Sequence, residues 1–185
     1  MKQAVRRIVT GHDAKGRAII QSDAPAERVM TLPHNGPTFY EIWNTRETPA
    51  RIDRSSGEPH EPGVTLSPPP LGTRIRVLDI PPETDASPAQ GAAARELFAS
   101  IGAGDALSGG ADNARHPHMH RTETIDYGIV LEGEITLLVD EGDTVVRAGD
   151  IVIQRGTNHG WANRSGKNCR IAFILIDGKF AADLS

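Results

Sequence analysis

The chain has 185 residues, of which 24 are acidic and 20 basic, giving a net charge of -4 at pH 7. This length predicts one domain, 1–185, that buries a core without disulfides, and the single cysteine cannot form an internal one. The basic residues form no stripe and no apolar run approaches the roughly 20 residues of a membrane span, so we expect neither nucleic acid nor a membrane as partner. No charged and then apolar leader follows Met1, so a cytoplasmic location is expected.

The N-terminal part, 1–80, is predicted to be a β arm followed by a Pro-rich loop. Two short β-prone runs, 4–9 and 17–21, surround a glycine-bounded turn and predict a hairpin. The polar, Pro-rich stretch 46–72 lacks strand periodicity and is expected to be a long loop, acting as a linker or a lid. Further strands are expected at 28–32, 38–43 and 73–80.

The rest of the chain predicts one helix and then a barrel. In 87–101, Ser87 can cap a helix, Pro88 suits its first turn, and an apolar stripe follows, so we expect a short helix packed outside the barrel. From about residue 115, roughly five or six β-rich segments follow at short intervals between Gly- and Asp-containing turns. This spacing is typical of a β-barrel built from hairpins, with the barrel core at 105–180.

Histidines recur at intervals of two in this part of the chain, at His116, His118 and His120. Residues two apart in a strand point to the same face, so one face carries imidazoles. Two or three histidines on one face inside a barrel favour metal binding, whereas the alternative is an exposed polar strand. A second block, 149–163, contains His159.

These two blocks resemble the two sequence motifs of the cupin superfamily. The first motif has a glycine, H-x-H, a carboxylate and, seven positions later, another glycine. The matching residues here are Gly110, His118, His120, Asp126 and Gly133. The second motif, G-x5-P-x-G-x2-H-x3-N, resembles 149–163, with Gln154 at the proline position and a spacer one residue shorter. The resemblance covers roughly 110–176 and implies an all-β fold, a double-stranded β-helix or jelly-roll barrel, here with an N-terminal β arm and one short helix.

The resemblance also implies a metal site. One divalent transition ion would be held by His118, His120, Asp126 and His159. Asp126 stands where glutamate is usual and lies further from His120 than the motif has it, so it either coordinates the ion or hydrogen-bonds a ligand histidine. Glu123 is a rival carboxylate with the wrong spacing to Gly133. Imidazole and carboxylate donors suit Fe, Mn, Ni, Cu or Zn, whereas Ca and Mg want more oxygen ligands.

A substrate pocket is expected beside this site. By alternation from His159, Trp161 and Asn163 would face the same cavity, Trp161 as an apolar wall and Asn163 as a polar anchor. The alternative for Trp161 is a plain core aromatic. Tyr127, next to Asp126, is also expected in the pocket, and Tyr127 and His116 are the candidate bases.

Two classes of function remain open. The first is a metal-dependent enzyme acting on a small organic substrate, an oxygenase, decarboxylase or lyase/isomerase, with the metal as Lewis acid or O2-binding centre. The alternative is a non-catalytic small-molecule-binding or regulatory barrel, although nothing before Asp105 predicts a DNA-binding helix pair. A metal-free sugar-nucleotide epimerase ranks last, because such barrels use a different His and Tyr pattern. We also expect a homodimer, because the N-terminal hairpin has too little core of its own and must pair with another sheet edge.

Overall fold

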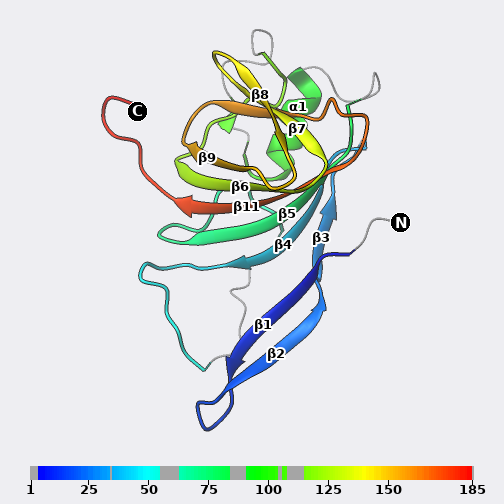
Figure 1. The fold of residues 1–185 in the computed structure, drawn as a ribbon. Coiled ribbons are helices and arrows are strands. Elements are labelled where there is room, and N and C mark those ends of the chain that lie inside the picture. Colours follow the sequence, from blue (N-terminus) through cyan, green and yellow to red (C-terminus); the bar gives the residue numbers. More distant parts are fainter. Residues whose placement is uncertain are drawn as a thin grey trace.

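The computed structural model describes residues 4–33, 35–54, 63–83, 91–103, 106–107 and 115–184. In these residues the chain forms a β-barrel with a projecting two-stranded arm and one short helix (Figure 1), which confirms the all-β prediction. The elements in chain order are β1 (Arg6–His12), β2 (Ala18–Pro25), β3 (Arg28–Thr31), β4 (Thr38–Asn44), β5 (Thr73–Ile80), α1 (Gly91–Ser100), β6 (Thr124–Glu132), β7 (Glu134–Val139), β8 (Asp143–Arg147), β9 (Ile151–Arg155), β10 (His159–Ala162) and β11 (Cys169–Asp177). No helix in the described ranges is both long and apolar enough to cross a membrane.

Two antiparallel sheets make the barrel. The larger has six strands in the order β3-β4-β5-β11-β6-β9, and the smaller has the order β10-β7-β8. The chain passes from one sheet to the other at Gly133, whose φ is 78°. A Cβ at this position would lie 2.7 Å from the carbonyl oxygen of Asn168, so only glycine fits the crossing. Close packing against Asn168 therefore explains why a glycine stands at position 133.

Strand alternation decides which side chains enter the barrel. On β6, Asp126 and Val130 are buried, whereas Ile125 and Tyr127 are exposed. The inward residues of both sheets meet in one apolar core. Its buried members are Leu32, Phe39, Leu78, Ile80, Phe98, Ile101, Ala103, Val130, Ile135, Val146, Cys169 and Ile171.

The N-terminal hairpin is present as predicted, formed by β1 and β2. Its turn is held by Asp13, whose Oδ1 accepts hydrogen bonds from the backbone N–H groups of Lys15 and Arg17. Among the described residues the two strands pair only with each other, and Figure 1 shows them projecting from the barrel. The homodimer expected from this arm stays a prediction.

The helix lies within its expected range, at Gly91–Ser100. The cap residues Ser87 and Pro88 lie outside the described ranges, as does Gly110 of the first motif. The expected packing outside the barrel is wrong in one respect, because Phe98 of α1 is buried in the barrel core. In the loop 46–72, the described parts contain neither helix nor strand, which agrees with the prediction, and its role as a lid stays untested.

Candidate metal centre and cavity

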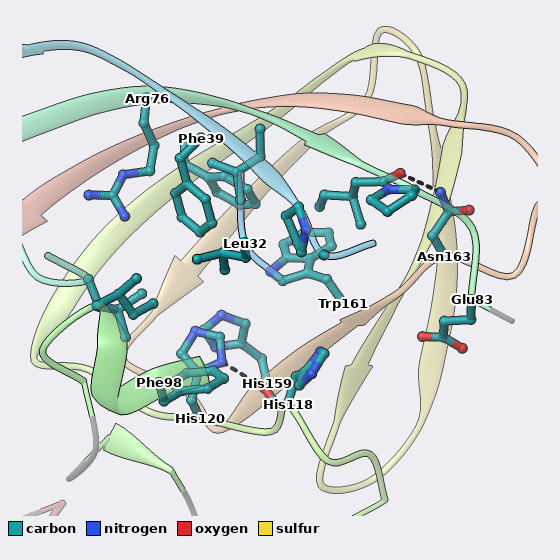
Figure 2. Close-up of a pocket in the computed structure, with 18 of the residues that line it drawn as sticks. Leu32, Phe39, Arg76, Glu83, Phe98, His118, His120, His159, Trp161 and Asn163 are labelled. Carbon is teal, nitrogen blue, oxygen red and sulfur yellow. Dashed lines mark hydrogen bonds between the residues drawn. The ribbon is translucent and has the colours of Figure 1, made fainter. Parts of the chain in front are cut away.

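A cavity of about 170 Å³ lies inside the barrel (Figure 2). Its wall is mainly apolar and includes Leu32, Phe39, Leu66, Leu78, Ile80, Phe98, Ile101, Trp161, Phe173 and Leu175. The polar residues that line it are Asn35, Arg76, Glu83, His118, His120, Asp126, His159 and Asn163. A largely apolar hollow with a few polar groups is the usual form of a small-molecule site.

His120 and His159 form the centre of the polar group. Their backbones pair in both directions, with N···O distances of 2.8 and 2.9 Å, and their ring centroids lie 4.2 Å apart. Each Nδ1 lies 2.9 Å from a carbonyl oxygen, that of His118 for His120 and that of Thr157 for His159. A carbonyl can only accept, so each Nδ1 carries the proton and each Nε2 keeps a free lone pair. This is the tautomer in which histidine binds a metal through Nε2.

His118 is the third histidine of the cavity. Its Nε2 is buried and has no hydrogen-bond partner in the described part of the chain. Its backbone N–H donates to Nδ1 of His116 over 3.2 Å. The other ring nitrogen of His116 therefore carries a proton and donates it to Oε1 of Glu83 over 2.9 Å. His116 is thus a tether between two loops and does not line the cavity, which argues against a role as base.

Burial sets the protonation of these groups. It lowers the pKa of His118 and His159 to about 4 and that of His120 to about 3, so all three imidazoles are neutral at physiological pH. Burial also raises the pKa of Asp126 to about 6, against the opposing effects of the Thr124 hydroxyl and the Arg76 charge. Oδ1 of Asp126 is buried and has no hydrogen-bond partner in the described ranges. Such unsatisfied buried atoms are rare and commonly mark a site for water or an ion.

The predicted ligands are brought together only in part. His120 and His159 are in contact, and His118 and Asp126 line the same cavity. Within the described residues, however, no three His, Cys, Asp or Glu side chains lie close enough to hold an ion as they stand. The donors nevertheless fit a transition metal in kind, because they are neutral imidazoles with available Nε2 atoms and one buried carboxylate oxygen. Closure around an ion requires at least one of these side chains to move.

The three predicted pocket residues lie in different surroundings. Trp161 lines the cavity, with its ring edge-on to His159 at 6.3 Å and to Phe173 at 5.4 Å between centroids. Asn163 also borders it, but its amide donates to the carbonyls of Ile80 and Lys167 over 2.7 and 2.8 Å, so it is a structural brace and not a free anchor.

The expectation for Tyr127 needs correction. The side chain is 37% exposed and does not line the cavity. Its neighbour Asp126 points inward, and in a strand the next residue must then point outward. The same alternation that places Asp126 at the site therefore removes Tyr127 from the pocket and from the candidate bases.

Sequence reasoning missed most of the cavity wall, including Phe98, Arg76 and Glu83. Phe98 reaches the imidazoles from α1, with its ring centroid 5.1 Å from that of His120. Arg76 lines the cavity from β5, and Glu83 lies just after that strand. Two of them carried a signal. Phe98 belongs to the apolar stripe of the predicted helix. Arg76 lies in a strand in which both alternating sets of residues mix charged and apolar side chains, so either face would bring a charge inward.

The sequence of this chain is similar to those of known proteins from one family. The cupin domain family (Cupin_2) matches residues 106–176, which include both histidine blocks. The chain is 30% identical over 182 residues to the Phomopsin biosynthesis cluster protein C' of Diaporthe leptostromiformis, covering 94% of this chain and 78% of that protein. It is 28% identical over 181 residues to the cupin-domain-containing oxidoreductase fogC of Aspergillus ruber, covering 94% and 72%. It is also 28% identical over 188 residues to the cupin-domain-containing oxidoreductase virC of Hypocrea virens, covering 97% and 78%. The chain therefore belongs to the cupin superfamily.

Proposed function

We propose that this protein is a metal-dependent cupin oxidoreductase acting on a small organic molecule bound in the barrel cavity. The observation that carries the proposal is the meeting of three neutral histidines, His118, His120 and His159, on one mainly apolar cavity. Relatives that cover nearly the whole chain bear the name cupin-domain-containing oxidoreductase, which favours redox chemistry over a decarboxylase or a lyase. A non-catalytic small-molecule-binding barrel is the rival, and the incomplete convergence of the donors favours it.

The side chains have separate parts in this proposal. Nε2 of His120 and His159 would bind the ion together with His118, and Asp126 would be the fourth ligand. When bound, the ion supplies Lewis-acid polarisation or, as iron, a binding position for dioxygen. The carbonyls of His118 and Thr157 hold the two imidazoles in the required tautomer. Phe98 and the other aromatic walls exclude water from the reacting molecule.

Metal analysis of the protein purified without added metal tests this proposal. We expect about one divalent transition ion per chain in the wild type and a marked loss in His118→Ala, because its buried Nε2 has no other partner among the described residues. Elemental analysis by mass spectrometry measures both. A wild type that stays metal-free after equilibration with Fe(II), Mn(II), Ni(II), Cu(II) or Zn(II) contradicts the proposal and favours the binding barrel.

Asp126→Asn is expected to have two opposite effects. It should weaken metal retention, because a neutral amide is a poorer donor to a dication than a carboxylate. It should also stabilise the metal-free protein at pH 7.5. Burial raises the pKa of Asp126 from its ordinary 3.8 to about 6. The carboxyl group therefore adds fully to the free energy of unfolding below pH 3.8, and this contribution is lost as the pH rises through about 6.

Chelated Asp126→Asn should therefore melt a few degrees above the wild type at pH 7.5, while the difference vanishes near pH 4. Thermal denaturation at the two pH values and metal titration measure the two effects. Unchanged metal affinity would leave a site made of three histidines alone. An unchanged melting temperature would mean that the carboxylate is solvated and not buried at the cavity wall.

A further inference from the structure

The end of the cavity away from the histidines carries a buried cation. Arg76 projects inward from β5, is 2% exposed and lines the cavity. Figure 2 shows Arg76 beside Phe39 on one side of the cavity and the three histidines on the other, with Leu32 between them. The guanidinium carbon lies 5.5 Å from the centroid of the Phe39 ring.

Two carboxylates act on the charge of Arg76, those of Glu41 and Asp126, and its hydrogen bonds satisfy it only partly. Its Nη2 donates to the carbonyl oxygen of Thr65 and lies 3.1 Å from Oε1 of Glu41. Glu41 is shared, because Oε2 also accepts a hydrogen bond from Nη1 of Arg74 over 3.1 Å. The Nε of Arg76 is buried without a hydrogen-bond partner in the described ranges. Burial lowers the pKa of Arg76 to about 10, so the side chain is still a cation at neutral pH.

A buried cation that borders a mainly apolar cavity attracts an anionic group strongly. We propose that this end of the cavity is an anion subsite built on Arg76, and that the substrate is a small apolar molecule carrying one carboxylate. The assignment deepens the proposed function, on which it rests for the reacting end of the molecule. A carboxylate at Arg76 would direct the other end of the molecule toward the histidines.

The size of the cavity limits the apolar part. About 170 Å³ is below the roughly 300–1,000 Å³ of pockets that take drug-sized ligands, so the body of the molecule is near one ring in size. Phe39, Trp161 and Phe173 line the cavity and would pack against such a ring. The substrate class is therefore a single-ring or short-chain carboxylate.

A matched pair of probes tests the subsite. Cinnamate and cinnamamide have the same apolar body and differ in carrying a carboxylate or a neutral amide. Binding is followed by the fluorescence of Trp161 in a Trp43→Phe background, since Trp43 is the one other tryptophan and does not line the cavity. We expect cinnamate to bind about 10 to 100-fold more tightly, the range for a hydrogen bond to a charged group. Equal affinities in the wild type, or no binding of either probe, would overturn the assignment.

Two arginine variants make the test specific. Arg76→Met removes the cavity cation and leaves Glu41 with Arg74, so we expect the preference for cinnamate to disappear. Arg74→Met removes an equal charge from the same cluster but does not face the cavity, so we expect the preference to remain. If Arg76→Met fails to melt cooperatively, Arg76→Lys replaces it, and a reduced preference of several-fold is then expected because the planar fork is lost.

A chelator separates this assignment from the proposed function. Each titration is repeated with metal removed, and metal content is measured for every variant. A preference that survives chelation and is lost in Arg76→Met supports the subsite even if the wild type holds no metal. A preference that chelation removes and Arg76→Met retains would place the carboxylate on the metal, which overturns the subsite and upholds the proposed metal site.

Discussion

His120→Ala and His159→Ala are each expected to abolish metal binding at the proposed site. Either change removes one of two adjacent imidazoles whose free Nε2 atoms are set by hydrogen bonds from Nδ1 to carbonyl oxygens. Changes to groups that only support a ligand already cost about 10 to 100-fold in affinity, so loss of a ligand should cost more than about 100-fold. Elemental analysis and competitive metal titration measure this loss.

The fold should survive these two changes. The link between residues 120 and 159 consists of backbone hydrogen bonds, which an alanine retains. His116→Ala is the matched control, because its imidazole belongs to the same short segment but binds Glu83 and does not line the cavity. It should keep its metal. Full occupancy in both His120→Ala and His159→Ala would mean that these histidines are ordinary core residues.

Asp79→Ala is expected to cause the largest loss of stability. The carboxylate is fully buried and receives hydrogen bonds from Nε and Nη2 of Arg170 over 2.7 and 2.8 Å, and from the hydroxyl of Tyr40 over 3.1 Å. Its removal leaves the guanidinium of Arg170, whose side chain is 14% exposed, without this counter-charge in the sheet. Breaking such a buried pair from one side costs about 3–5 kcal/mol in the free energy of unfolding. Urea denaturation measures it.

Asp23→Ala is the matched control for this prediction. Asp23 binds Nε and Nη2 of Arg6 over 2.7 and 2.6 Å, the same two-point geometry, but on the exposed hairpin. Its loss should be much smaller, since solvent screens exposed pairs. Equal losses in both variants would show that the geometry of the pair, and not its burial, determines its contribution.

Acid should reduce the effect of Asp79→Ala. Burial by itself would raise the pKa of Asp79, but the hydrogen bonds and charge of Arg170, with help from Asn168 and Tyr40, hold it below the ordinary value of 3.8. A lowered pKa contributes stability that is present above the ordinary value and is lost as the pH falls through the folded value. The difference between wild type and Asp79→Ala should therefore shrink below about pH 3.8.

The local pattern of the sequence was enough to predict most of the barrel. The hairpin, the strand at 73–80 and the successive strands after residue 115 follow from alternation and turn residues, which act over a few residues. His118, His120 and His159 line one cavity, whereas His116 does not, and residues 116–118 form a bend and a turn where a strand was expected. The strand predictions succeed because side chains in a strand alternate regardless of what the strand packs against, whereas the histidine segment reaches the cavity through a turn.

Only the tertiary structure decided what each inward position does. Arg76 is a cavity residue because Glu41, on a strand far from it in sequence, supplies a buried counter-charge. Asn163 is a brace because the carbonyl of Ile80, 83 residues away, lies within reach of its amide. Phe98 enters the barrel from a helix whose local pattern predicts only an apolar stripe. Local periodicity predicts which residues share a face of a strand. Which residues then meet inside the barrel depends on how distant strands are paired and in which register, and no local pattern contains that information.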